Sequence, residues 1–413
     1  TSLLDSIIEG LSSTQEDNII RSYRLLQSLQ LPDQSWDRIL KLGTKTVIDH
    51  LKGSFSQAVQ REAMETMYSV CASSEYACAR LYAHQVTQDI IGVYRECKDP
   101  IVKNGLLSVL TAFVDLLGHP AGNQCRVLMP TVLESFSRQD PKGQVVIGEF
   151  LEALSETTEP VLCEYDAPRV DFGFKEGTHA QLCLIAACHN WNMKTADAFL
   201  DNLIEYVNAF RLNNPSGTSA EECYEKIFKI MANIYAGDRV FPNPVIENIL
   251  AEEILSGRAT PSVMNAFSNY LQALSCQLPN DIIEHVKTRL FECVKDNPDI
   301  LSASTNLLRA MAMECDFTMT PEEERSLYAI ESTEALVNIA PLIYHCSQSV
   351  ERDAFIAACL FHKDAQVCME YTENAVMFEY PIPDRQRLID RLTGLQEKES
   401  QADYLINLLT QEE

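Results

Sequence analysis

The sequence predicts an all-α protein built from repeated helical pairs, on three observations. Nearly every segment between Ser2 and Thr410 reads as an amphipathic helix of about three to five turns, broken by short connectors that carry Pro, Gly, Asp or Asn. No convincing run of alternating apolar and polar residues occurs, and 15 Gly and 17 Pro in 413 residues are too few for a large all-β fold. The helices also recur at a nearly fixed spacing. We therefore expect one elongated stack of helices instead of two or three globular domains.

Several helix starts can be placed from their capping residues. Ser13–Glu16 (Ser-Thr-Gln-Glu) and Ser219–Glu222 (Ser-Ala-Glu-Glu) each offer a hydroxyl followed by a carboxylate that can reach back to free amides. Pro100, Pro261 and Pro321 occupy positions where a first-turn proline is tolerated, because the N–H that proline lacks has no helical partner there. These residues predict helix starts at five places.

The repeat is sharpest in the second half of the chain, where equivalent apolar positions recur at a constant step of 40. Three such series are Cys183, Cys223, Val263 and Ala303; Ala187, Ile227, Phe267 and Leu307; and Trp191, Met231, Leu271 and Met311. The companion helices repeat with them, because Ile246, Leu250 and Ile254 recur at the same step as Val286, Leu290 and Val294. Two helices per unit, each with its own apolar stripe, indicate a stack of helical pairs.

The first half shows a looser version of the same repeat. Its apolar triplets are Tyr23, Leu26 and Leu29, then Met64, Met67 and Val70 at a step of 41, then Leu107, Leu110 and Phe113 at a step of 43. The companion helices contribute Ile48, Ile90 and Val132 at steps of 42. A period that drifts in this way is typical of short loop insertions in a stack whose core is kept.

One stretch of the first half also shows a family pattern. Ala58–Val70 has a valine, Val59, near its start and an alanine four residues on. A later helix through Asp89–Arg95 ends before a turn that contains Asp99. In this order of residue types, over about residues 10–315, the chain resembles the armadillo and HEAT superfamily. The resemblance implies a right-handed superhelical α-solenoid of irregular repeats, whose faces commonly hold segments of partner proteins. The regular asparagine ladder of peptide-binding armadillo proteins is lacking.

Two interruptions of the repeat predict the domain boundaries. Residues 166–178 are the longest non-helical stretch, and Tyr380–Asp384 precedes a charged terminal helix. We expect an N-terminal half-solenoid at 1–165, an inter-half loop at 166–178, a C-terminal half-solenoid at 179–315 and a helical cap at 316–413. The apolar side of the terminal helix consists of Leu388, Ile389, Leu392, Leu405, Leu408 and Leu409. This side can cover the end of the stack or pair with a second copy in a homodimer.

Charge and cysteine content narrow the setting of the protein. The formal charge is −26, of which residues 1–200 carry −8 and residues 201–413 carry −18, so we expect no direct nucleic-acid binding and a preference for basic partners. The 14 cysteines are scattered along apolar helix faces, which is typical of reduced thiols in an intracellular protein, cytoplasmic or nuclear. We expect no membrane insertion, because no apolar run reaches about eighteen residues. The chain begins with Thr1 and not with Met, so we expect a fragment or a processed protein.

Signatures of catalysis are largely lacking in the sequence. No Gly-rich phosphate loop, Gly-x-Ser-x-Gly elbow, Cys-x-x-Cys or His-Glu-x-x-His motif occurs. Cys183, Cys188 and His189 share a helix, but Cys183 and Cys188 point about 140° apart on it, so we interpret this group as structural, and likewise His345-Cys346. We therefore predict no catalytic residue, no metal site and no cofactor. An enzyme whose site assembles near the 166–178 loop stays as one alternative.

The shape of the predicted stack carries the functional hypothesis. The second helix of each unit is expected to line a concave face and to present six acidic residues to a partner: Asp201, Glu205, Glu247, Glu252, Glu284 and Glu292. We therefore expect a non-enzymatic interaction scaffold or adaptor that binds a basic or amphipathic segment of a partner protein. A second hypothesis is a transport receptor or chaperone-type regulator that binds a folded client, such as a GTPase or a basic cargo.

Overall fold

A computed structural model describes residues 2–159, 171–191, 196–237, 240–274, 278–396 and 398–411. All regular secondary structure in these residues is helical. The chain divides into two compact units, Thr1–Lys226 (unit 1) and Ile227–Glu413 (unit 2), and each is described by itself.

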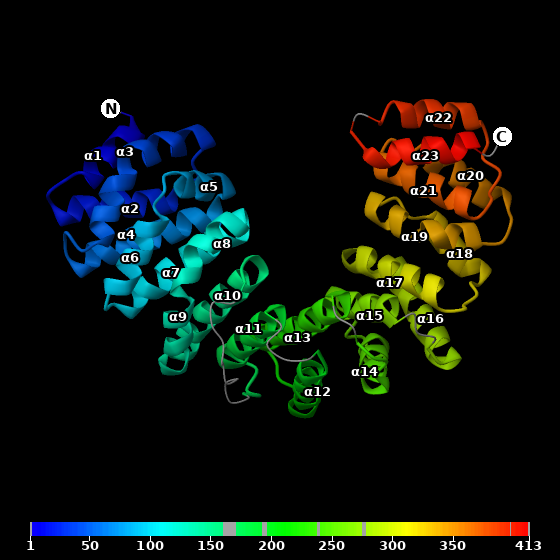
Figure 1. Cartoon of the computed structure of the whole chain (residues 1–413), viewed down its shortest axis with the longest axis horizontal. Helices are drawn as coiled ribbons and strands as arrows, with labels where there is room; N and C mark the ends of the chain where they lie inside the picture. Colours follow the sequence, from blue (N-terminus) through cyan, green and yellow to red (C-terminus); the bar gives the residue numbers. More distant parts are fainter. Residues whose placement is uncertain are drawn as a thin grey trace. The chain divides into compact units, whose positions relative to one another are not determined.

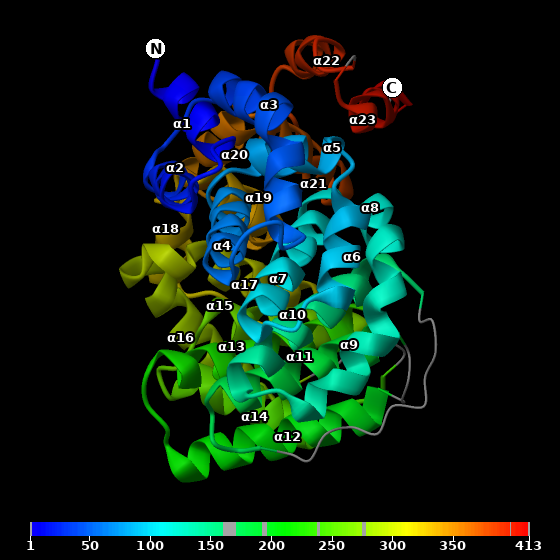
Figure 2. The same cartoon turned by 90° about the vertical axis from the view of Figure 1, so that its left-hand side faces the viewer.

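Unit 1 is a stack of helices in which a first row runs through the whole unit. Its helices are α1 (Leu3–Leu11), α2 (Glu16–Ser28), α3 (Asp33–Leu51), α4 (Gln57–Ser73), α5 (Glu75–Ala83), α6 (Thr87–Glu96), α7 (Pro100–Leu117), α8 (His119–Cys125), α9 (Met129–Ser135), α10 (Pro141–Thr157), α11 (Glu176–Asn190) and α12 (Ala196–Asn213). Each of α2, α4, α7, α10 and α11 packs on the next, and Figure 2 shows α2, α4, α7 and α10 in this order. Short 3-10 turns flank α9, at Arg126–Leu128 and Phe136–Arg138.

Unit 2 consists of two rows of alternating helices. After α13 (Thr218–Gly237), which crosses the division between the units, it contains α14 (Pro244–Leu255), α15 (Pro261–Leu274), α16 (Asn280–Asp296), α17 (Leu301–Glu314), α18 (Pro321–Tyr328), α19 (Thr333–His345), α20 (Val350–Leu360), α21 (Ala365–Met377), α22 (Arg385–Thr393) and α23 (Ser400–Gln411). Helices α15, α17, α19, α21 and α23 pack each on the next and form the first-helix row of unit 2 (Figure 1). Helices α14, α16, α18 and α20 form the second-helix row.

The predicted apolar stripes are the core of the stack. All members of the three apolar series that repeat in the second half are buried, from Cys183 to Met311. In the first half Tyr23, Met64 and Leu107, which head the three triplets, are buried as well. Rows of helices that pack each on the next, with buried apolar stripes between them, confirm the prediction of an all-α stack of helical repeats.

The prolines predicted the starts of their helices correctly, whereas the Ser13 hydroxyl did not. Pro100, Pro261 and Pro321 are each the first residue of their helices, as predicted. The prediction at Ser13 was wrong, because the cap of α2 is Gln15, and the Ser13 hydroxyl accepts the Gln15 N–H at 3.1 Å without reaching the first turn. A complete capping box lies instead at Thr320, before α18.

The C-terminal region extends the stack. Helices α17, α19 and α21 begin at Leu301, Thr333 and Ala365, so the step between successive starts shortens to 32 in this part of the chain. The single terminal helix predicted after Asp384 is wrong, because α22 and α23 are two helices that pack on each other. Gly394 directly follows α22, where a helix commonly ends. The proposed cap and homodimer roles of this region stay predictions.

The predicted junction at 166–178 is described only in part, because residues 160–170 lie outside the described residues. The helices on either side of it, α10 and α11, pack closely on each other. The Cβ that Gly148 of α10 lacks would lie 3.0 Å from the Ala180 carbonyl oxygen and from the Cys183 Cβ on α11. Glycine at 148 therefore permits the close approach of these two helices.

Helix α7 corrects one expectation about apolar runs. Its 18 residues, Pro100–Leu117, are long and apolar enough to cross a membrane by composition, with a mean hydropathy of 1.5. In unit 1 this helix packs against α4 and α10. Its apolar face, which includes Leu106, Leu107, Leu110 and Phe113, is fully buried in the core. The central place of α7 in unit 1 thus explains this buried face, whereas Ile101 and Leu116 of the same helix are exposed.

Candidate functional site

Two adjoining clefts cross the C-terminal turns of the first-helix row in unit 2. The larger, of about 460 Å³, lies between α17, α19 and the connector after α17, and the smaller, of about 420 Å³, spans α17, α19 and α21. They share Ala312 and His345, so together they form one groove, called here the α17–α19–α21 groove. The lining of the larger cleft comprises Ala312, Cys315, Asp316, Phe317, Thr318, Met319, Glu324, Leu342, His345 and Ser347. The lining of the smaller comprises Arg309, Ala312, Met313, Pro341, His345, Glu370, Glu373, Asn374, Met377 and Phe378.

A proline in the middle of α19 organises the floor of the smaller cleft. Pro341 has no N–H, so the carbonyl of Val337, four residues earlier, has no helical donor. The guanidinium of Arg309 on α17 fills this vacancy, because Nη1 donates to the Val337 oxygen at 3.0 Å. Its Nη2 lies 2.7 Å from the Glu370 carboxylate on α21. Arg309 therefore ties three successive helices of the row together beneath the groove.

Apolar side chains form the walls of the smaller cleft. Met313 of α17 and Met377 of α21 are 60% and 63% exposed, unusually high for methionine side chains on a packed row of helices. The ring of Phe378 packs edge-on against His345, with the ring centroids 4.8 Å apart. Flexible, polarisable methionines on an open surface suit contact with apolar side chains of differing shape.

The carboxylates of the groove are unequal in their partners. Glu370 is neutralised by Arg309 and also accepts a hydrogen bond from Asn374 Nδ2 at 3.2 Å. Glu373, Asp316 and Glu324 form no ion pair in the part of the chain that the structure describes. Their hydrogen bonds are neutral: Glu373 accepts from Gln401 at 2.9 Å, and Glu324 accepts from the Ser347 N–H at 2.9 Å.

The backbone adds to the negative potential of the groove. Helices α17, α19 and α21 end at Glu314, His345 and Met377, so their last carbonyl groups, which carry partial negative charge, lie along it. Arg309 is the sole Lys or Arg among the described residues that line the two clefts, and it is already paired. The groove thus combines an apolar wall with a surplus of negative charge.

The six acidic residues predicted to bind a partner all lie on second helices, as expected. Asp201 and Glu205 are exposed on α12 of unit 1. Glu247 and Glu252 lie on α14, and Glu284 and Glu292 lie on α16, two helices that contribute no residue to the lining of the α17–α19–α21 groove.

Glu247, Glu284 and Glu292 have partners within unit 2. Glu247 accepts the Tyr270 hydroxyl at 2.6 Å, Glu284 pairs with Lys287 at 2.9 Å, and Glu292 pairs with Arg289 at 2.8 Å. The excess of acidic residues is visible in the sequence, but these contacts are not. The role of the six residues in partner binding stays a prediction.

The described part of the 166–178 segment has structural partners. Asp171 accepts the Gly173 N–H at 2.8 Å, and its carbonyl accepts the Thr178 hydroxyl at 2.9 Å. Phe172 and Phe174 pack edge-on against Tyr206 and Phe210 of α12. Residues 171–178 therefore dock the start of α11 on α12, and the remainder of the loop lies outside the described residues.

The cysteines and histidines of the described residues hold no group that could bind a metal. Burial raises the pKa of Cys223 to about 12 and that of Cys346 to about 11, so both thiols are protonated at neutral pH. Cys71 and Cys78 share a hydrogen bond that lowers the pKa of Cys78, but Cys78 is buried. Buried and mostly protonated thiols fit the core role predicted for them.

A second gathering of carboxylates lies in unit 1. Lys226 of α13 bonds to Glu152 of α10, beside Asp115 and Glu156. Burial, followed by the charge of Glu152, raises the pKa of both Asp115 and Glu156. No exposed methionine pair accompanies these groups among the described residues, so we do not take them as the candidate site.

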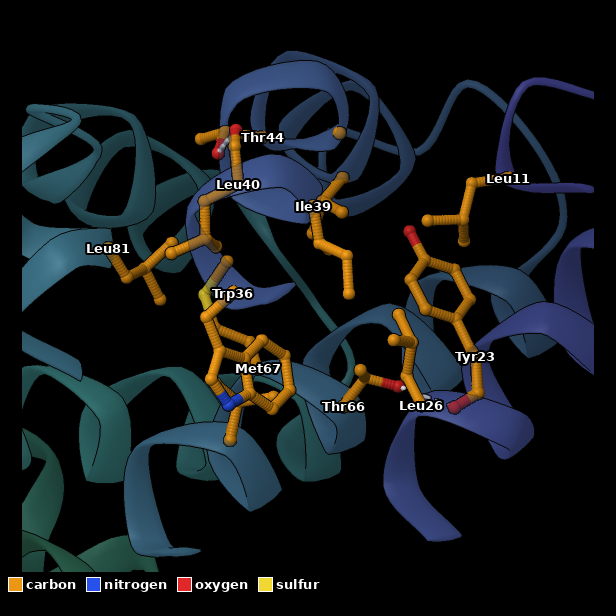
Figure 3. A pocket seen from close by; sticks show the side chains of 13 residues that line it. Leu11, Tyr23, Leu26, Trp36, Ile39, Leu40, Thr44, Thr66, Met67 and Leu81 are labelled. Carbon is orange, nitrogen blue, oxygen red and sulfur yellow. Dashed lines mark hydrogen bonds between the residues drawn. The ribbon is translucent and has the colours of Figure 1, made fainter. Parts of the chain in front are cut away.

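Unit 1 also contains a small apolar slot between α1, α2, α3, α4 and α5, of about 40 Å³ (Figure 3). Leu11, Leu26, Ile39 and Trp36 point into it, and at its edge the Tyr23 hydroxyl is hydrogen-bonded to His50 at 2.5 Å. Such a volume holds little more than a methyl group or two. We interpret the slot as imperfect core packing.

Asparagines of the first helices join neighbouring helices of the stack. Asn190 donates to the Ser155 hydroxyl at 2.9 Å, Asn269 to the Ala232 carbonyl at 2.9 Å, and Asn338 to the Ser302 carbonyl at 3.1 Å. These amides serve the packing of successive repeats.

Known proteins resemble this chain in structure but not in sequence. No family model matches the chain, and no curated protein matches it. An engineered protein is 13% identical and has a TM-score of 0.47, covering 100% of this chain and 98% of its own. A designed armadillo repeat protein in complex with the peptide (KR)4 is 12% identical, with a TM-score of 0.39, over 66% of this chain and 99% of its own.

A natural protein is also among the similar structures. The karyopherin Kap121p, bound to the extreme C-terminus of the protein phosphatase Cdc14p, is 10% identical and has a TM-score of 0.47. The match covers 98% of this chain and 52% of the karyopherin, so the chain spans about half of the karyopherin's length.

Proposed function

We propose that the chain is a non-enzymatic protein interaction module whose α17–α19–α21 groove binds a basic or amphipathic segment of a partner protein. One observation carries this proposal. The same groove is lined by exposed methionines and by carboxylates that form no ion pair among the described residues. A partner that covers Met313 and Met377 gains the burial of apolar surface, about 25 cal/mol per Å². Charge complementarity then selects among apolar partners.

A random-peptide display library, selected against the full chain, tests this proposal without knowledge of the partner. We expect the selected peptides to bind the Met313→Glu and Met377→Glu chains about tenfold more weakly or worse, because a central apolar contact is replaced by a charge. Glu252→Gln and Glu292→Gln, on the second-helix row, are the matched controls and test the predicted acidic surface in the same assay. Peptides that bind wild type and both methionine variants equally would refute the groove as the binding site.

A further inference from the structure

We infer that the α17–α19–α21 groove recognises a segment in which one apolar side chain lies between two basic ones. This inference rests on the proposed function and adds the chemistry of the partner. It follows from the unequal state of the carboxylates and from the position of the apolar wall between them.

The apolar position is fixed by the smaller cleft. Met313 and Met377 come from α17 and α21, and Pro341 of α19, which lies between those two helices in the row, completes the lining. The exposed methionines therefore lie on the two helices that flank α19, whose Pro341 is buried. An aliphatic side chain placed between the methionines would contact α17 and α21.

Two basic positions follow from the carboxylates that remain available. Glu370 is excluded, since the Arg309 guanidinium and the Asn374 amide already bond to it. Glu373 lies on α21, at one end of the groove. Asp316, in the connector after α17, and Glu324, on α18, line the larger cleft at the other end. Because the groove is continuous through Ala312 and His345, these carboxylates flank the apolar position on both sides.

The larger cleft suits a long basic side chain in particular. Phe317, Met319 and Leu342 line it together with the two carboxylates. Lysine and arginine bury their aliphatic stems against apolar surface and keep the charged head beside acids. An acidic or phosphorylated segment is disfavoured, because the three carboxylates that lack an ion pair among the described residues would repel it.

Charge-swap variants in the same peptide display test the inference position by position. Selection on wild type is expected to enrich Lys or Arg on both sides of an apolar residue. Selection on Glu373→Lys is expected to replace the basic residue by Asp or Glu on one side only, and selection on Asp316→Lys to do so on the other side. The matched control, Glu252→Lys on α14, is expected to leave the pattern unchanged. Glu373, Asp316 and Glu252 all lie at least partly at the surface, and thermal unfolding of each variant checks that it is folded.

The outcomes separate this inference from the function on which it rests. Groove-dependent peptides that lack basic residues, or that keep them on Glu373→Lys and Asp316→Lys, overturn the inference and leave the interaction function standing. Peptides whose binding ignores Met313→Glu and Met377→Glu overturn both. If one charge-swap variant changes the selected residues on both sides of the apolar position, the two-sided arrangement is overturned. Binding that falls about tenfold with each swap for the peptides selected on wild type supports it.

Discussion

At the scale of single residues, Arg309 links the floor of the groove to the packing of the stack. Its guanidinium donates to the Val337 carbonyl, which has no helical donor because residue 341 is proline. It also forms an ion pair with the Glu370 carboxylate on α21. A planar, permanently charged group with several donors in a fixed fork can bond to both at once in a geometry that the single nitrogen of lysine does not provide. The same bonds explain why Glu370 is unavailable to a partner.

Replacing Arg309 tests this role. We expect Arg309→Met to lower the free energy of unfolding by about 1–3 kcal/mol, because the Val337 carbonyl and the Glu370 carboxylate each lose a partner. Arg138→Met is the control, since the Arg138–Glu134 pair is on the surface, and there we expect a change within about 0.5 kcal/mol. Urea denaturation measures both. Equal effects of the two substitutions would show that Arg309 is only another surface charge.

The small apolar slot in unit 1 gives a second test at the scale of one residue. A Cβ added at Gly43 of α3 meets Leu11 Cδ1 at 3.9 Å, an ordinary contact. We expect Gly43→Ala to raise the free energy of unfolding by about 1 kcal/mol through its helix propensity. Gly105→Ala in α7 is the matched control, because its Cβ would lie 1.7 Å from Met64 Sδ, and there we expect destabilisation. Thermal or urea unfolding decides, and a loss at Gly43 would contradict the packing described for the slot.

At the scale of elements, the start of α7 depends on one buried carboxylate. Asp99 caps the helix by accepting the Ile101 N–H at 3.1 Å, and it also bonds to Arg61 at 2.7 Å and Gln57 at 2.8 Å. The Arg61 hydrogen bond is the main cause that lowers the pKa of Asp99. The central helix of unit 1 is therefore joined to α4 through a charged cap.

The lowered pKa gives this cap a defined pH dependence. A carboxyl whose folded pKa is depressed contributes stability above its unfolded pKa, near about 3.9, and loses it as the pH falls through the folded value. We expect Asp99→Asn to cost about 1–3 kcal/mol at neutral pH, and the gap from wild type to close progressively in acid. Urea denaturation over a pH series measures the gap. A gap that stays constant would contradict a charged role. Asp5→Asn, at a more accessible carboxylate for which we expect a smaller effect, is the control.

The elements also show what could be read from the sequence. The stripes through Cys183, Val263 and Leu307 were predictable, because a stack buries one face of every helix and so imposes a period on apolar residues. The groove was not predictable. Met313 and Met377 look like any other apolar helix residues, and their exposure depends on the shape of the row. A proline at 341, inside a helical pattern, was the one local signal available.

At the scale of the whole molecule, the excess of acid is distributed in two ways. On the second helices, Glu284 and Glu292 are matched by bases on their own helix. Around the α17–α19–α21 groove, Asp316, Glu324 and Glu373 have no ion pair within the described residues. Net charge alone, −26 for the chain, could not separate these two surfaces, because pairing depends on the neighbours that folding supplies.

The shorter repeat near the C-terminus coincides with the groove. Helices α17, α19 and α21 start at a closer spacing than the apolar series of the first helices upstream, which keep one constant step from Cys183 to Ala303. That longer step does not continue past α17, although α19, α21 and α23 continue the row of packed helices. The proposed binding surface therefore lies where the sequence pattern loses its regularity.

Hydrogen–deuterium exchange of the full chain, with and without a peptide from the display selection, tests the central claim most directly. We expect slower exchange in the C-terminal turns of α17, α19 and α21 and in the connector at 315–319. We expect no change in α14 and α16, which carry four of the predicted acidic residues. Protection confined to α14 and α16, or the same protection pattern on the Met313→Glu chain, would contradict the assignment of the binding site to this groove.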